Sequence, residues 1–350
     1  MDGGMLRSRV KWLETGEKPS SFFLSLEKRN SVNKTINRVV GADGSEKCNI
    51  NSIKDECFSF YEKLYDKKKI NLSDFHDFIK EDTFTCLSEN QKQDLEGPIK
   101  HDEILSALKR MSNNKSPGLD GFTVEFYKVF FKDLSWFLVR SLNDSYDSGS
   151  LSITQNRGVI TLLPKGQKPR EFLKNWRPIS LLNVSYKLAS ACIANRLKSV
   201  LPDLISQDQS GFMPGRFIGE NIRQIYDIMN YTEINNIPGL LLLVDFEKAF
   251  DSVSHEFIFK ILDIMNVGDS FKKWIKVFYE NAQSTVLVNG HMTPFFENKA
   301  GCRQGDGLSP YIFLLCAQVL NIAINNNDDI HGILVNDKRV RCYNMLMILL

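Results

Sequence analysis

Residues 240–251 have the sequence LLLLVDFEKAFD, in which an apolar run leads into acidic residues. The four leucines and Val244 predict a buried strand, and Asp245 lies at its end. A buried carboxylate is costly unless a cation neutralises it. Carboxylate ligands suit magnesium bound to substrate phosphates, so the segment indicates phosphoryl or nucleotidyl transfer. The alternative is that Asp245 is a helix N-cap or a solvated strand end.

Composition favours a globular protein with an uneven charge distribution. The 350 residues are 43% hydrophobic and 25% charged, which predicts one large domain with appendages. Residues 155–216 contain ten Lys or Arg against three Asp or Glu, whereas residues 217–350 contain eleven against fifteen. A basic segment before an acidic one suits a polymerase-like site, although solvated charged faces give the same asymmetry.

The cysteine pattern and the lengths of the apolar runs indicate the cellular compartment of the protein. The seven cysteines are odd in number and contain no CxxC pair, which predicts free thiols in a reducing compartment and argues against a zinc site. The chain opens without a signal peptide, and no apolar run reaches the ~20 residues that span a bilayer. We therefore expect an intracellular protein of the cytoplasm and nucleus with no membrane partner.

Periodicity and turn-forming residues predict the other elements. Helices are expected at 53–65, 104–111, 122–142, 184–200, 256–265, 271–281 and 311–324. Strands are expected at 159–163 and 285–288, and the second is followed by Asn289-Gly290, which is typical of a type I′ hairpin. The first ninety-five residues predict a charged, helical lead-in that carries little chemistry.

Two further segments predict contacts with phosphates or nucleotides. Lys165 and Arg177 flank an expected hairpin, where a lysine point charge and a planar arginine fork could clamp a triphosphate. Taken singly, each is also compatible with an ordinary surface cation. In residues 300–310, AGCRQGDGLSP, two glycines and polar side chains at a helix start allow close backbone approach to a nucleotide or template.

Six motifs in one order resemble the reverse transcriptase region of LINE-type, non-LTR retrotransposon polyproteins. They are NKSPGLDG (114–121), ITLLPK (160–165), NWRPISLLN (175–183), QSGFMPGR (209–216), VDFEKAFD (244–251) and CRQGDGLSP (302–310). The similarity covers nearly the whole chain, because residues 1–95 resemble the linker that follows the endonuclease in such polyproteins. It implies an α+β, right-hand polymerase fold with fingers at about 96–235 and a partial palm at about 236–350. The thumb and the upstream endonuclease are expected to be absent.

The resemblance implies an RNA-directed DNA polymerase that uses an RNA template, a DNA primer and deoxynucleoside triphosphates. Asp245 matches the first metal-binding aspartate, and the backbone carbonyl of Phe246 would help to hold Mg²⁺. Phe250 matches the bulky residue that excludes a ribose 2′-hydroxyl, although an ordinary core phenylalanine is the alternative.

The remaining motif residues are assigned in the same way. Lys165 and Arg177 match residues that bind the incoming triphosphate. Gln304 and Gly305 match the segment that packs against the nascent base pair and template. Asp251 and Asp306 belong to these motifs but are expected to have capping or structural roles.

Two-metal nucleotidyl transfer requires further carboxylates, which the family supplies in a Tyr-Ala-Asp-Asp turn. After Asp337 this chain has no aspartate and ends in Asn-Met-Leu-Met-Ile-Leu-Leu. The codons AAT ATG CTG ATG ATA CTT, read two bases later, encode Tyr-Ala-Asp-Asp-Thr. We therefore expect a frameshift or a gene-model error and no activity in the chain as printed. The alternatives are a catalytically dead remnant that only binds nucleic acid and a group II intron-type maturase.

Overall fold

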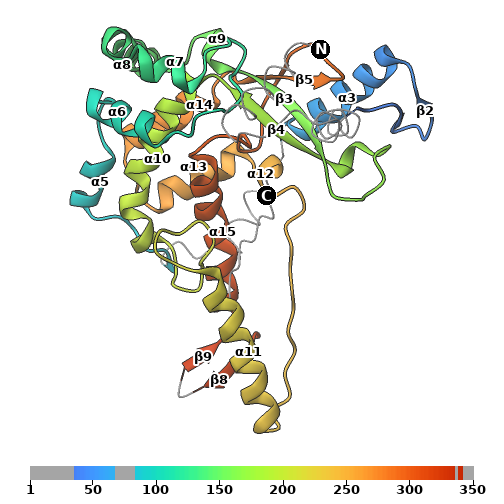
Figure 1. Ribbon diagram of the computed structural model, residues 1–350. Helices are drawn as coiled ribbons and strands as arrows, with labels where there is room; N and C mark the ends of the chain where they lie inside the picture. Colours follow the sequence, from blue (N-terminus) through green and yellow to red (C-terminus); the bar gives the residue numbers. More distant parts are fainter. Residues whose placement is uncertain (1–34, 68–82, 336–337, 342–350) are drawn as a thin grey trace, which may run out of the picture. The chain divides into compact units, whose positions relative to one another are not determined.

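The computed structural model describes residues 35–67, 83–335 and 338–341, and it combines helices with small sheets in an α+β arrangement (Figure 1). The chain forms two compact units. The first contains the described residues up to Tyr61 together with Ile160–Ile179 and Thr285–Phe296. The second contains the described parts of Glu62–Val159, Ser180–Ser284 and the residues from Glu297 onward. The expected boundaries near residues 95 and 235 stay predictions.

The first unit is built around a short hairpin and one helix. Strands β1 (Val39–Val40) and β2 (Glu46–Lys47) pair antiparallel, with Val39 opposite Lys47. Helix α3 (Ile50–Leu64) buries Ile53, Cys57 and Tyr61. These residues recur every four positions and therefore lie on one face of the helix. The helix predicted at 53–65 is confirmed.

The largest sheet has the strand order β4-β3-β5-β6, and β7 also pairs with β5. Its strands are β3 (Arg157–Pro164), β4 (Trp176–Leu182), β5 (Gln283–Val288), β6 (His291–Met292) and β7 (Phe296–Glu297). Asn289 and Gly290 have φ values of 50° and 88°, as a type I′ turn requires. The predicted hairpin is therefore confirmed, with Val288 opposite His291.

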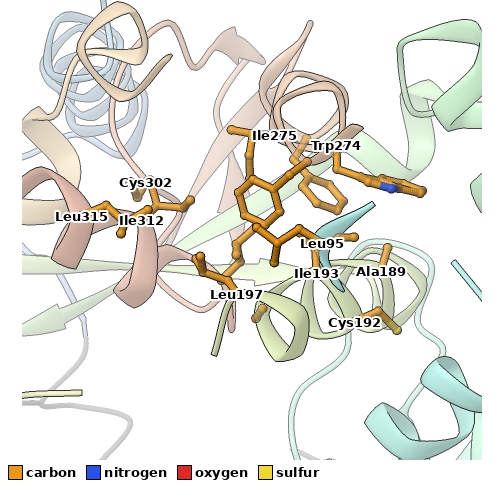
Figure 2. Close-up of a cluster of buried hydrophobic side chains, with 14 of the residues drawn as sticks. Leu95, Ala189, Cys192, Ile193, Leu197, Trp274, Ile275, Cys302, Ile312 and Leu315 are labelled. Atoms are coloured by element: carbon orange, nitrogen blue, oxygen red, sulfur yellow. The ribbon is translucent and has the colours of Figure 1, made fainter. Parts of the chain in front are cut away.

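Helices make up most of the second unit. Their bounds are α5 (Glu89–Leu95), α6 (His101–Arg110), α7 (Val124–Val129), α8 (Phe131–Ser148), α9 (Ile153–Asn156), α10 (Val184–Leu204), α11 (Ile218–Ile234), α12 (Ala249–Ser252), α13 (His255–Ile264), α14 (Asp269–Tyr279) and α15 (Ser309–Asn325). Helix α10 lies at the centre and contacts α5, α6, α14 and α15. Figure 2 shows Ile193 and Leu197 of α10 with Trp274 of α14 and Ile312 of α15 in the resulting core.

The remaining elements are short. The 3-10 helix η2 (Leu173–Asn175) precedes β4, and β8 (Ile333–Val335) pairs antiparallel with β9 (Lys338–Val340). No helix in the described ranges has the length and apolar character needed to cross a bilayer. Six cysteines lie in the described residues, and all six are free thiols, as the sequence predicts.

The single core helix predicted at 122–142 is wrong in two respects. The helix is interrupted at Phe130, which is the C-cap of α7 and the N-cap of α8 and has φ −96° and ψ 15°. Trp136 and Phe137 are exposed rather than buried. The segment around the break, VEFYKVFF, is rich in β-branched and aromatic residues, which lose rotamer freedom in a helix.

The buried strand predicted at Leu240–Val244 is also wrong. These residues belong to no strand, and their exposed fractions range from 51% at Leu241 to 93% at Leu240. Strand propensity takes effect only where a neighbouring strand accepts the backbone hydrogen bonds. No described strand pairs with this segment. Asp245 therefore lies on an exposed segment, and the premise that its carboxylate is buried does not hold.

Candidate active site

The segments around Phe250 and Cys302 are joined by main-chain hydrogen bonds. The Cys302 N–H donates to the Phe250 carbonyl at 2.6 Å, and the Gly301 N–H donates to the Val253 carbonyl at 2.7 Å. An isolated bridge between Ser254 and Ala300 extends the pairing. The motifs VDFEKAFD and CRQGDGLSP therefore form one local structure, although fifty residues separate them in the sequence.

The Gln304-Gly305 turn is fixed against the end of β4. The Ser180 N–H donates to the Gln304 carbonyl at 2.7 Å. Gly305 has a φ of +112°, and a Cβ atom there would lie 2.5 Å from the Ser180 carbonyl oxygen. Only glycine adopts this conformation without strain, so the turn lies against β4 because residue 305 has no side chain.

Asp251 is buried, with an exposed fraction of 2%, and both of its carboxylate oxygens accept hydrogen bonds. The Tyr65 hydroxyl donates to Oδ1 at 2.6 Å, and the Gln304 Nε2 donates to Oδ2 at 3.0 Å. This arrangement agrees with the structural role expected for Asp251.

Asp306 lies in a second buried cluster and begins the approach to α15. Its Oδ1 accepts from the Leu308 N–H at 3.1 Å, and the Tyr186 hydroxyl donates to Oδ2 at 3.3 Å. Burial raises the pKa of the Asp306 carboxyl, and hydrogen bonds and the nearby Arg303 charge oppose the shift. Of the capping or structural roles expected for Asp306, these contacts agree with the structural one, because no side chain caps the start of α15.

Neighbouring titratable groups are held in their neutral forms. Burial raises the pKa of the Cys302 thiol to about 12, so this cysteine is not a thiolate nucleophile at neutral pH. Burial lowers the pKa of His255, whose Nε2 lies 3.0 Å from the Gly301 carbonyl oxygen. The His255 ring also stacks on Tyr279 at a centroid distance of 4.5 Å. These groups therefore support the fold around the turn.

Phe250 belongs to the hydrophobic core, with an exposed fraction of 8%. Its ring lies 5.2 Å from that of Phe313 on α15, and the Phe246 ring contacts Phe313 edge-on at 5.7 Å. The packing matches the core alternative for Phe250. Its expected effect on sugar selection stays a prediction.

The described residues do not complete a metal site around Asp245. Its side chain is exposed on the segment that precedes α12. No group of three or more His, Cys, Asp or Glu side chains in the described ranges could hold a metal ion. Asp245 and the Phe246 carbonyl are oxygen donors of the right chemistry for Mg²⁺, but the described donor set is incomplete.

Lys165 and Arg177 belong to the first unit. Both are partly buried, and they lie at the two ends of the connection between β3 and β4, as the sequence predicts. The Lys165 N–H donates to the Asn175 carbonyl at 2.9 Å, and its Nζ donates to the Lys174 carbonyl at 3.0 Å. These contacts fix the Lys165 end of the connection.

The structure adds residues that the motifs alone do not identify. Tyr65, which follows α3, joins the site through Asp251, and no local sequence signal indicates a contact over 186 positions. Lys187 on α10 is partly buried. Burial lowers its pKa, and the charges of Asp306 and Asp120 act in the opposite direction. Its position after the NWRPISLLN motif is the only sequence signal that could have identified it.

Comparisons with known proteins show which protein family the chain resembles. The family model described as "Reverse transcriptase (RNA-dependent DNA polymerase)" matches residues 163–341. The "Transposon TX1 uncharacterized 149 kDa protein" of Xenopus laevis is 35% identical over 316 residues, covering 90% of this chain and 24% of the relative. The "Retrovirus-related Pol polyprotein from type-2 retrotransposable element R2DM" of Drosophila melanogaster is 28% identical over 211 residues, covering 59% and 19%.

A further Drosophila melanogaster relative, "Probable RNA-directed DNA polymerase from transposon BS", is 26% identical over 226 residues, covering 62% of this chain and 24% of the relative. The chain belongs to the reverse transcriptase family, a class of nucleotidyltransferases. Within it, the relatives identify a LINE-type, non-LTR retrotransposon region. The chain spans about a quarter or less of the length of these relatives.

Proposed function

We propose that the chain is the RNA-directed DNA polymerase region of a LINE-type retrotransposon protein. The observation that carries this proposal is the joining of Phe250, Gln304 and Gly305 in one local structure within the family match. The expected partners are an RNA template, a DNA primer and deoxynucleoside triphosphates. Residues 155–216 would lie along nucleic-acid backbone, which gives salt-sensitive, sequence-independent binding.

We propose the following roles within a fingers region at about 96–235 and a palm region at about 236–350. Lys165 and Arg177 contact the triphosphate of the incoming nucleotide. Gln304 and Gly305 lie against the nascent base pair, and Phe250 limits space beside the sugar. The basic side chains supply the charges that a triphosphate requires.

Asp245 is proposed as a ligand of Mg²⁺, the metal that supplies charge stabilisation in two-metal nucleotidyl transfer. The carbonyl of Phe246 would add a second oxygen. Among the described residues, Asp245 is the one carboxylate proposed for this ion. We therefore assign to Asp245 the roles of binding Mg²⁺ and orienting it. Binding of the primed template is the part of the function that the chain can be tested for directly.

A second candidate is a region that binds nucleic acid without catalysis. It is favoured by the proposed frameshift, in which the codons AAT ATG CTG ATG ATA CTT for residues 344–349 would encode Tyr-Ala-Asp-Asp-Thr when read two bases later. Catalysis without those carboxylates would lose its main charge stabilisation. Nucleotide sequencing tests the frameshift directly, because codons other than AAT for Asn344 or CTG for Leu346 contradict this reconstruction.

The two candidates are separated by primer extension with magnesium and a primed RNA template. The chain is compared with the product of the in-frame locus, which carries Tyr-Ala-Asp-Asp-Thr from residue 344 and continues through the rest of the palm and the thumb. We expect binding by both and extension only by the second, lost in Asp245→Ala and retained in the matched control Glu247→Ala. Extension by the printed chain that depends on Asp245 would overturn the non-catalytic candidate. If neither version binds the template, both candidate functions are overturned.

A further inference from the structure

Three side chains from distant parts of the sequence form one hydrogen-bonded series, Tyr65–Asp251–Gln304. Asp251 lies in the middle and accepts from Tyr65 at Oδ1 and from Gln304 at Oδ2, at 2.6 and 3.0 Å. The Asp251 N–H also donates to the Lys248 carbonyl at 2.8 Å, which fixes the residue in the main chain. The carboxylate is therefore anchored independently of Gln304.

The series determines which side of the Gln304 amide faces outward. The Gln304 Nε2 donates to Asp251 Oδ2 at 3.0 Å, so the amino group of the amide faces Asp251. The carbonyl oxygen Oε1 then lies on the opposite side of the amide. Gln304 is only partly buried, and no described residue hydrogen-bonds its Oε1. The side chain thus presents an acceptor at the surface of the site.

Main-chain hydrogen bonds hold the backbone at Gln304 in place. The Gln304 carbonyl accepts from the Ser180 N–H at 2.7 Å, and the preceding Cys302 is paired with Phe250. With the backbone held on both sides, the hydrogen bond to Asp251 is the contact that sets the side-chain direction. A glutamine released from this contact would rotate and lose its preorganised acceptor.

We propose that Asp251, clamped by Tyr65, is a positioning residue that fixes the Gln304 amide so that its Oε1 accepts a hydrogen bond from the incoming nucleoside triphosphate. The ligand group is a hydroxyl or amino donor. This inference rests on the proposed function, since it assigns a nucleotide to the same site. Tyr65, which lies outside the family match at residues 163–341, thereby contributes to binding of the nucleotide.

The first arm of the test examines the amide itself in the full chain without ligand. The ¹⁵N-labelled side-chain amide of Gln304 is assigned by the loss of its signals in Gln304→Ala. We expect slow solvent exchange in the unsubstituted protein, fast exchange in Asp251→Asn and an intermediate rate in Tyr65→Phe. The matched controls Asp227→Asn and Tyr226→Phe, at exposed positions on α11, should leave the signals unchanged. Fast exchange in the unsubstituted protein, or slow exchange in Asp251→Asn, would overturn the proposed clamp.

The second arm measures nucleotide selection with a primed RNA template whose DNA primer ends in a dideoxynucleotide. The complementary deoxynucleoside triphosphate should stabilise the unsubstituted complex at lower concentration than the non-complementary ones. Loss of one hydrogen bond predicts that Asp251→Asn raises the required concentration of the complementary deoxynucleoside triphosphate by about tenfold. A purely structural role for Asp251 would change the thermal stability of the free protein without changing the concentration of the complementary nucleotide that is required.

The outcomes separate the two levels of inference. If Asp251→Asn binds the complementary nucleotide as tightly as the unsubstituted protein does, Asp251 does not position Gln304 for the ligand. If the unsubstituted protein binds no primed template, the proposed function fails together with the ligand half of this inference. The exchange measurement then still decides whether the clamp exists, because it requires no nucleic acid.

Discussion

Arg196 and Glu103 form a partly buried, two-point ion pair between α10 and α6, with Nε–Oε1 at 2.7 Å and Nη2–Oε2 at 2.8 Å. The same guanidinium donates to main-chain carbonyls of the α5–α6 connection. These acceptors are Leu95 (3.2 Å), Glu96 (3.1 Å), Gly97 (2.8 Å) and Pro98 (2.8 Å). Arg196 therefore fixes a loop that has little secondary structure of its own.

Replacing Arg196 should destabilise the fold severely. Arg196→Met leaves the Glu103 carboxylate and four carbonyls without their donor. Because Glu103 is partly exposed, the expected cost is about 3 kcal/mol, the lower end of the range for breaking a buried pair. Denaturant unfolding measures the loss. The matched control Arg223→Met removes an exposed pair with Asp227, with atoms 3.7 Å apart, for which about 0–1 kcal/mol is expected. Equal losses in the two variants would contradict the structural role of Arg196.

His255 should make stability depend on pH. Burial lowers the pKa of His255 below its ordinary value of 6.5, and the Arg303 charge adds to this effect, while the hydrogen bond to Gly301 opposes it. The folded protein therefore binds a proton here less readily than the unfolded chain. The contribution to stability is complete above pH 6.5 and is lost as the pH falls through the lower folded pKa.

The measurement is the free energy of unfolding between pH 5 and pH 8. His255→Gln can still donate to the Gly301 carbonyl but has no proton to gain, so the slope in this range should become smaller. The exposed His291, changed to glutamine, serves as the control and should leave the slope unaltered. An unchanged slope in His255→Gln would show that this ring does not titrate with folding.

Gly305→Ala should disrupt the Gln304 turn. The added Cβ would meet the Ser180 carbonyl oxygen at 2.5 Å, and alanine is strained at a φ of +112°. Such strain costs about 1–3 kcal/mol. Gly307→Ala is a close control, because nothing lies within 4 Å of its added Cβ. The free energy of unfolding and template binding should both fall in Gly305→Ala and stay unchanged in Gly307→Ala. Equal behaviour of the two variants would show that the turn tolerates a side chain.

Features set by local chemistry could be predicted from the sequence. The Asn289-Gly290 turn follows from the positive φ that both residues adopt, and α3, α13 and α15 follow from apolar periodicity. The close backbone approach at Gln304-Gly305 follows from the glycines and polar residues of 300–310, whereas the roles assigned to these two residues by resemblance stay predictions. In each case neighbouring residues in the sequence decide the conformation.

Features that depend on distant contacts could not be predicted. The Tyr65–Asp251 hydrogen bond joins positions 186 residues apart, and neither residue has a local pattern that indicates the other. The strand expected at Leu240–Val244 requires a neighbouring strand, which side-chain pattern alone does not specify.

The exposed leucines give a test of the corrected segment. Leu242 has an exposed fraction of 75%, so Leu242→Lys should change the free energy of unfolding by no more than about 0.5 kcal/mol. Leu197 on α10 is fully buried, and Leu197→Ala should cost about 2–5 kcal/mol. Denaturant unfolding compares the two directly. If residues 240–244 were a buried strand, Leu242→Lys would be the more destabilising change, since the lysine would be unpaired in the core. A loss from Leu242→Lys as large as that from Leu197→Ala would therefore support a buried strand.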